Sequence, residues 1–329
     1  LMSEAVRGEG GYLLNNKGER FMANYAPSKM ELAPRDVVAK AIETEIAEGR
    51  GFGKGLDAYV VADVRHLPKE VILEKLHGIR ELAITFEHAD PLTQPIPIRP
   101  TCHYSMGGID VVDYKSCGTV VPGLFAAGEA ACVSVHGANR LGGNSLADAV
   151  VFGKVAGEGA IDYVKNNSAK DAKKALSEAA TAWETRFREV TGRKDGRPIA
   201  EIRDEMANAM WNKVGIFREE SKMQEALATI NKLIEEYKTC YVGDTNRTFN
   251  MAFVNYVEVG SLLTVAKAVV MGALRRQESR GSHLREDYTK RDDAKFLNHT
   301  LITLKEDGEY EVGQRDVVVT RFEPKERTY

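Results

Sequence analysis

The stretch HGANRLGGNSL, residues 136–146, is the most informative part of this chain, because it sets one His, one Arg, three Gly and two Asn directly before a predicted helix. Glycine lets backbone approach a ligand closely, and Arg140 offers a planar fork of donors for a carboxylate. The N–H groups of Ser145 and Leu146 at the helix start favour negative charge. For an arbitrary loop, a glycine-rich turn with Arg140 as a solvated charge is the commoner outcome.

The residues around this loop predict a nucleotide-binding arrangement. Residues 123–127 predict a short buried strand, Gly128 and Glu129 a turn, and a helix opens near Asn144. Strand, glycine-rich loop and helix in this order are typical of nucleotide sites. The dinucleotide fingerprint GxGxxG is missing from the sequence, and GRGFGKG at 49–55 has different spacing. We therefore expect a fragment whose fingerprint lies upstream.

The first hundred residues predict short strands mixed with helices. A helix runs from Pro34 or Arg35 to Ile46, with Val38 and Ile42 on the same face as Ile46. The prolines in IPIRP, residues 96–100, exclude a central strand and indicate an extended crossing between units.

The last half of the chain predicts helices followed by a small β-structure. Pro198 suits the first turn of a helix whose apolar residues keep helical spacing, and two further helices cover about 219–239 and 248–274. These segments indicate a three- or four-helix bundle. Residues 301–304 and 317–322 predict an antiparallel pair around a turn.

Composition limits the function classes. The 45 basic residues nearly balance the 48 acidic ones, so no broad basic field for nucleic acid exists. The four cysteines show no CxxC spacing, which favours a reducing compartment and argues against a metal site. No window approaches the run of about 20 apolar residues that a membrane span needs.

Together with GLFAAGEA (123–130) and PTCHYSMGG (100–108), the loop HGANRLGGNSL resembles the flavoprotein subunits of succinate dehydrogenase and fumarate reductase. Further strings extend the resemblance in order along essentially the whole chain: RGEGGYLLN (7–15), RDVVAKAIETEI (35–46), REDYTKRDDAKFLNHT (285–300) and RFEPKERTY (321–329).

The resemblance implies an α/β and α+β multidomain fold in which a capping domain closes over a flavin domain. We expect four parts: a capping domain at 1–98, the C-terminal part of a FAD-binding domain at 99–164, a helical bundle domain at 165–275 and a small C-terminal domain at 276–329.

The resemblance also assigns a dicarboxylate site. Arg140 and His103 would bind the substrate, with Ser3 and Glu4 lining the same pocket, so residues of the capping and flavin domains would converge. The family commonly has Thr at the position of Ser3, which keeps the hydroxyl. Taken alone, His103 would more often be a structural histidine.

Arg35 matches the arginine that transfers the proton in this family, while the flavin exchanges a hydride. A cation at a helix start opposes the helix dipole, so its placement needs a reason, and a salt bridge with Asp36 or Glu31 is the plainer one. Glu4 and Arg7 match the proton-relay segment, although their spacing fits an ordinary i,i+3 ion pair equally well.

For the cofactor, the resemblance implies FAD. The predicted cofactor-binding residues are Glu129, which lies eleven residues before Arg140, together with Asn144, Ser145 and Leu146. Taken alone, a Gly-Glu turn is usually structural. The family's covalent flavin histidine would lie outside this sequence, so we expect the fragment alone to be inactive.

The implied function is oxidation of succinate to fumarate, with electrons passing to an iron–sulfur subunit and then to quinone through membrane anchor subunits. The subunit would lie peripherally on the cytoplasmic face of the bacterial inner membrane, or on the matrix side in mitochondria. The alternatives are a fumarate reductase, the more distant L-aspartate oxidase, and a flavin-free module that only docks on an iron–sulfur protein or assembly factor.

Overall fold

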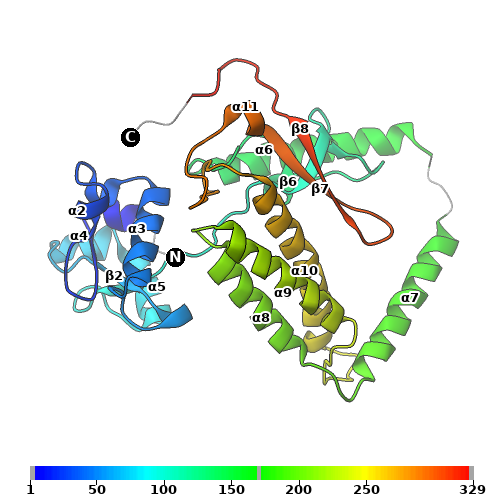
Figure 1. Cartoon of the computed structure of the whole chain (residues 1–329), viewed down its shortest axis with the longest axis horizontal. Helices are drawn as coiled ribbons and strands as arrows, with labels where there is room; N and C mark the ends of the chain where they lie inside the picture. The colour runs from blue at the N-terminus through cyan, green and yellow to red at the C-terminus, as the bar shows by residue number, and fades with distance from the viewer. Residues whose placement is uncertain (1–3, 169–171, 326–329) are drawn as a thin grey trace. The chain divides into compact units, whose positions relative to one another are not determined.

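A computed structural model describes residues 4–168 and 172–325 (Figure 1). The chain divides into two units, residues 1–104 and 105–329. Both mix helices with small sheets, as expected for a multidomain α/β and α+β protein. The finer division into four parts stays a prediction.

The first unit is built on a three-stranded antiparallel sheet with the order β1-β2-β3. The strands are β1 (Tyr12–Leu14), β2 (Val60–Asp63) and β3 (Ile96–Ile98). All four residues of the central strand β2 are buried, as expected for a strand covered on both faces. Two of them, Val60 and Ala62, belong to the unit's apolar core with residues such as Leu13 and Ile42.

The segment 96–100 is more than the extended crossing that its prolines predict. Its first three residues form β3, and Pro97 stands opposite Val61 of β2. Because β3 is an edge strand, it pairs only with β2. The N–H that Pro97 lacks is therefore not needed for a hydrogen bond to a strand on the other side. The exclusion of a central strand is confirmed.

The longest helix of the first unit is α3 (Arg35–Ala47), which confirms the predicted bounds to within a residue. Its residues Val38 and Ile42 are buried, and Ile46 packs against the same core. The other helices of this unit are α1 (Glu4–Gly8), α2 (Met22–Tyr25), η1 (Met30–Leu32), η2 (Gly55–Asp57), α4 (Lys69–Glu74) and α5 (His77–Glu87).

The second unit begins with a sheet of order β5-β4-β6. Its strands are β4 (Ile109–Asp113), β5 (Gly118–Thr119) and β6 (Ala131–Cys132). The predicted strand at 123–127 is wrong, since only an isolated bridge joins Phe125 to Gly118. Gly123 has a φ of 84°, so the chain turns where a strand would start.

The strand-like segment is followed by η3 (Gly128–Ala130), which packs against α6 (Asn144–Asn166). The predicted opening of a helix near Asn144 is confirmed. Four further helices complete the unit: α7 (Lys173–Thr191), α8 (Ile199–Val214), α9 (Glu220–Tyr237) and α10 (Met251–Arg275), with the short α11 (Asp293–Phe296) after them.

Helices α8, α9 and α10 pack on one another (Figure 1). Pro198 stands immediately before α8, as predicted, and Asn250 caps α10 by accepting a 2.7 Å hydrogen bond from the N–H of Phe253. The residues at the centre are fully or nearly buried: Ile202, Ile230, Leu233, Val259 and Leu263. The helical bundle is therefore confirmed for these helices.

One expectation about membranes is wrong. By length and composition, α10 is apolar enough to cross a membrane, although the sequence suggested that no segment is. In the second unit, this helix packs on α8 and α9 and contributes Tyr256, Val259 and Leu263 to their core.

The C-terminal strands are β7 (Asn298–Leu304) and β8 (Tyr310–Asp316), which pair antiparallel around Gly308. The predicted second strand at 317–322 is wrong: Val318 is 68% exposed, and pairing ends at Asp316. The chain reverses direction between Leu304 and Tyr310. Residues 310–316 therefore pair with β7 along its whole length, and residues 317–322 lie beyond the paired region.

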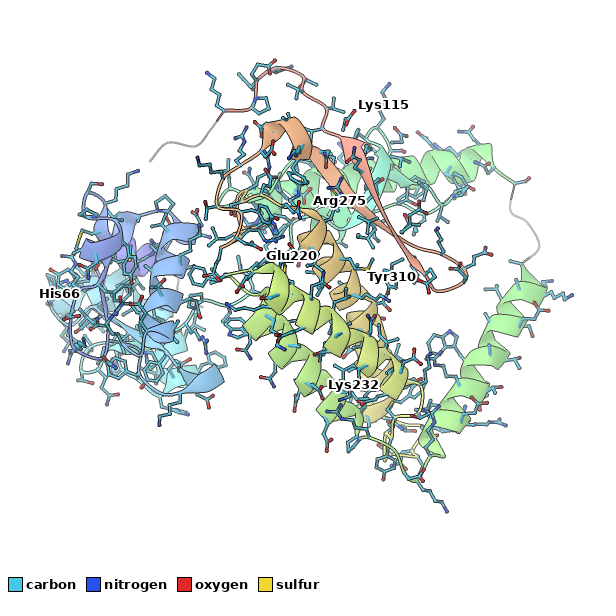
Figure 2. The ribbon with its side chains drawn as sticks, in the orientation of Figure 1. His66, Lys115, Glu220, Lys232, Arg275 and Tyr310 are labelled. Atoms are coloured by element: carbon cyan, nitrogen blue, oxygen red, sulfur yellow. The ribbon has the colours of Figure 1, made fainter. Side chains whose placement is uncertain are left out.

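The β7–β8 hairpin is attached to α10. The hydroxyl of Tyr310 donates to the Thr264 carbonyl at 3.3 Å, and Arg275 Nη2 donates to Gln314 Oε1 at 3.1 Å. Figure 2 labels Tyr310 and Arg275. Lys267 also lies over the Tyr310 ring.

Replacing the fully buried Ile230 with alanine should lower the free energy of unfolding by about 2–5 kcal/mol, because it leaves a cavity at the centre of the bundle. Denaturant unfolding measures the loss. Val265→Ala is the control, since this α10 side chain is 58% exposed, and its effect should stay within about 0.5 kcal/mol. Equal effects of the two variants would contradict the bundle core.

Candidate functional site

The start of α3 carries an ion pair with α1. Arg35 donates from Nε and Nη2 to the same Glu4 oxygen, Oε2, at 2.9 and 2.7 Å. The hydrogen bond from Arg35 is the main cause that lowers the pKa of Glu4. Glu31, an alternative partner considered for Arg35, instead binds Arg20 at 2.6 Å. The carboxylate of Glu4 thus offsets the cation at the helix start.

Arg7 lies on the other side of Glu4. Its Nη2 is 3.9 Å from Glu4 Oε1, so the i,i+3 pair exists but is long. Its Nη1 donates to two backbone carbonyls, those of Glu31 at 2.6 Å and Ala33 at 3.0 Å. Burial lowers the pKa of Arg7, whose side chain is 10% exposed. The structure therefore brings Arg35, the predicted catalytic residue, together with Glu4 and Arg7, the predicted relay residues, in the line Arg35–Glu4–Arg7.

Two of the predicted substrate-binding residues, Ser3 and His103, are not part of this line of contacts. Ser3 lies outside the described residues. His103 belongs to the first unit and is exposed. Their substrate roles stay predictions.

In the second unit, the glycine-rich loop leads into α6 through Gly143, which has a φ of 82°. No side chain caps this helix start. Asn144 and Leu146 are exposed there, and Ser145 is half-buried. The N–H groups of Asn144 and Leu146 donate to the carbonyls of Leu141 and Gly143 at 3.3 and 3.2 Å, and the positive end of the helix dipole here favours an anionic group.

Arg140 lies in this loop, half-buried, and its Nη1 donates to the Leu141 carbonyl at 2.9 Å. His136 at the loop's start lies with Nε2 3.2 Å from Oδ2 of Asp148, whose side chain is 1% exposed. This contact ties the loop to the second turn of α6.

Contacts from the C-terminal part of the chain also hold the loop and Ser134, two residues before it. Ser282 donates from its backbone N–H and its Oγ to the Ala138 carbonyl, each at 2.9 Å. His299 Nε2 lies 2.9 Å from Ser134 Oγ. Sequence reasoning missed these anchors, because the partners lie 144 and 165 residues apart and no local pattern relates them.

Glu129 lies in η3 and is exposed. Its Oε1 accepts a 2.8 Å hydrogen bond from the Ser105 N–H. Since η3 packs against α6, Glu129 and the start of α6 belong to the same part of the second unit. Within residues 4–168 and 172–325, no group of three or more His, Cys, Asp or Glu side chains could hold a metal ion.

The start of α6 fits a flavin, because a reduced flavin carries negative charge that the positive end of a helix dipole stabilises. Comparison with known proteins agrees. Residues 1–146 match the family model of an FAD binding domain, and residues 203–329 match that of the fumarate reductase flavoprotein C-terminus.

The flavoprotein subunit of 8-methylmenaquinol:fumarate reductase from Wolinella succinogenes is 52% identical over 330 residues, covering 100% of this chain and 54% of that subunit. The chain belongs to the succinate dehydrogenase and fumarate reductase flavoprotein family. The family resemblance drawn from its motifs is confirmed.

Other members of the family show the same partial coverage. The mitochondrial succinate dehydrogenase [ubiquinone] flavoprotein subunit of Oryza sativa subsp. japonica is 42% identical over 92% of this chain and 49% of its own length. A solved E. coli quinol fumarate reductase aligns with a TM-score of 0.90 and 38% identity, covering 99% of this chain and 57% of that one. The chain spans about half the length of the curated relatives it matches.

Arg35→Gln should raise the pKa of Glu4 toward its ordinary value, because the hydrogen bond that lowers it most is weakened and its charge removed. Side-chain carboxyl NMR titration measures this shift. Arg65→Gln is the control, since Arg65 pairs with Asp63 and does not touch Glu4. An unchanged Glu4 titration in Arg35→Gln would contradict the ion pair.

Proposed function

We propose that the intact subunit containing this chain oxidises succinate to fumarate with FAD. The observation that carries the proposal is the line Arg35–Glu4–Arg7, which joins a candidate proton acceptor to a carboxylate 2.7 Å away. Fumarate reduction, the reverse reaction, is the second candidate, because the relative that is 52% identical bears that name. The same residues serve both directions.

Arg35 is the proposed catalytic residue. In the oxidation, Arg35 gives a proton to the Glu4 carboxylate through their 2.7 Å contact, and in its neutral form it takes the proton from the carbon next to the one that loses a hydride. Arg7 sits beyond Glu4 at 3.9 Å and is the next group of the proposed relay. Its burial, which lowers its pKa, supports this role because an arginine in water keeps its proton.

The proposed substrate-binding residues are Arg140, His103, Ser3 and Glu4. A dicarboxylate needs cations or hydrogen-bond donors at both ends, and Arg140 supplies a guanidinium on an anchored loop. The anchors at Ser134, Ala138 and Asp148 support this assignment, because a binding residue must be held in place before the ligand arrives.

FAD, when bound, supplies the acceptor for the hydride. Asn144, Ser145 and Leu146 would hold its negatively charged edge at the start of α6, and Glu129 would accept a hydrogen bond from it. The match of residues 1–146 to an FAD binding domain supports this placement.

We further propose that the subunit passes electrons to an iron–sulfur subunit and then to quinone through a membrane anchor. The relatives are named as subunits of menaquinol- and ubiquinone-linked enzymes, which supports a peripheral place at a membrane. The proposed side is the cytoplasmic face of a bacterial inner membrane, or the matrix side of a mitochondrial one.

The first test uses the intact subunit and follows dye reduction by succinate, with malonate as competitor and aspartate as alternative substrate. Succinate oxidation that malonate inhibits supports the proposal. Oxidation of aspartate instead would indicate an L-aspartate oxidase, and absence of bound flavin would indicate a docking module.

Arg35→Lys should abolish turnover while flavin stays bound, because an ammonium lacks the planar fork that meets Glu4 and the substrate. Steady-state rates and the flavin absorbance spectrum measure the two effects. Arg65→Lys, which alters a surface arginine paired with Asp63, is the control and should keep its rate. Near-normal turnover in Arg35→Lys would exclude Arg35 as the proton acceptor.

Arg140→Ala should weaken malonate binding by roughly 1.5–3 kcal/mol, which is about ten- to a hundredfold, because a charged hydrogen-bond partner is lost. Flavin difference spectra during a malonate titration measure the dissociation constant. Arg275→Ala is the control, as this side chain contacts Gln314 of the C-terminal hairpin. If both variants bind malonate like the wild type, Arg140 does not hold a substrate carboxylate.

A further inference from the structure

The carbonyls that hold Arg7 belong to a single short segment, residues 30–33. The Nη1 atom of Arg7 donates to the Glu31 carbonyl at 2.6 Å and to the Ala33 carbonyl at 3.0 Å. These contacts are shorter than the 3.9 Å contact with Glu4. The place of Arg7 in the relay therefore depends on where this segment puts its carbonyls.

The segment has a conformation that needs support. Met30 has a φ of 49°, a left-handed value that costs free energy for a residue with a side chain. Residues 30–32 form the single 3-10 turn η1, and no side chain caps it. Such a turn persists only where surrounding contacts determine it.

The side chain of Glu31 supplies those contacts. It is 3% exposed, and its Oε1 accepts from the Leu13 N–H of β1 at 3.2 Å. Arg20 donates Nε to Oε1 at 2.8 Å and Nη2 to Oε2 at 2.6 Å. Burial opposes ionisation, yet these hydrogen bonds hold the pKa of Glu31 below its ordinary value. The carboxylate thus ties η1 to the central sheet.

The same segment leads directly to the proposed catalytic arginine. Ala33 and Pro34 connect η1 to α3, which begins at Arg35. A shift of Glu31 would therefore move both ends of the line, the carbonyls around Arg7 and the start of the helix that carries Arg35. Small displacements of a reacting group cost large factors in rate.

We propose that Glu31 is a positioning residue for proton transfer, which acts by fixing the carbonyls that hold Arg7 and the chain that presents Arg35. This inference rests on the proposed function. Glu31 touches neither substrate nor flavin in this role, so its loss should lower kcat and leave KM nearly unchanged.

The first unit contains a matched control. Glu45 is also a buried carboxylate, 1% exposed, and Arg50 donates to it at 2.7 and 2.8 Å. Asn15 and Tyr25 complete its partners. Unlike Glu31, it lies in the last turns of α3, away from the carbonyls around Arg7.

The experiment compares Glu31→Gln with Glu45→Gln in the intact, flavin-loaded subunit. Both should lower the melting temperature, since each removes a buried ion pair. Glu31→Gln alone should lower kcat by about tenfold or more with KM within about twofold. Equal kcat values in the two folded variants would overturn the proposal.

Arg20→Met provides a second variant, which removes the other partner of the same ion pair. It should reproduce the loss of kcat. The double variant with Glu31→Gln should have nearly the same kcat as either single variant, because both substitutions remove the same interaction. Additive losses would contradict a shared mechanism. This variant decides the question if Glu31→Gln fails to fold.

A readout independent of activity separates this inference from the proposed function. Proton exchange at the guanidinium of Arg7, followed by nitrogen-15 NMR, should be faster in Glu31→Gln than in Glu45→Gln, since the carbonyl contacts loosen. A wild type without succinate or fumarate turnover would overturn the proposed function. Unchanged Arg7 exchange would overturn the positioning role, whatever the activity.

Discussion

Buried carboxylates paired with arginine are the interaction on which both units depend. A carboxylate taken out of water is costly unless cations and N–H groups surround it, so the chain must bring those partners together from distant positions. Glu31 and Glu45 meet this requirement in the first unit through Arg20 and Arg50. Glu278, with no exposed surface, meets it in the second through contacts with arginines 276 and 280.

In each unit, the segment that contains a buried carboxylate also contacts a candidate site residue or its loop. Glu31 is followed by the carbonyl of Ala33, which accepts from Arg7. Glu278 is followed within a few residues by Gly281 and Ser282, which meet Ala138 in the loop of Arg140. Gly281 has a φ of 58°, and a Cβ there would lie 2.5 Å from the Ala138 carbonyl oxygen, so only glycine fits. Stability and site geometry are therefore linked.

Prediction from sequence succeeded where local patterns carry the signal. The helices α3, α8, α9 and α10 follow from apolar residues at helical spacing and, for α3 and α8, from a proline just before the helix start. It failed for the short strands. Residues 123–127 and 317–322 are apolar enough to be strands, but a glycine turn bends the first, and pairing ends before the second. Pairing partners, not composition, decide whether such short runs become strands.

The sequence by itself determined the family, the helices α3, α8, α9 and α10, and the identity of the candidate residues, since motifs such as HGANRLGGNSL and RDVVAKAIETEI are contiguous strings. Only the tertiary structure decided which groups meet. It brought Arg35 to Glu4, 31 residues away, and Ser282 to Ala138, 144 residues away. No sequence pattern contains these distances, because an ion pair or a backbone contact between remote segments exists only once the intervening chain has packed its core.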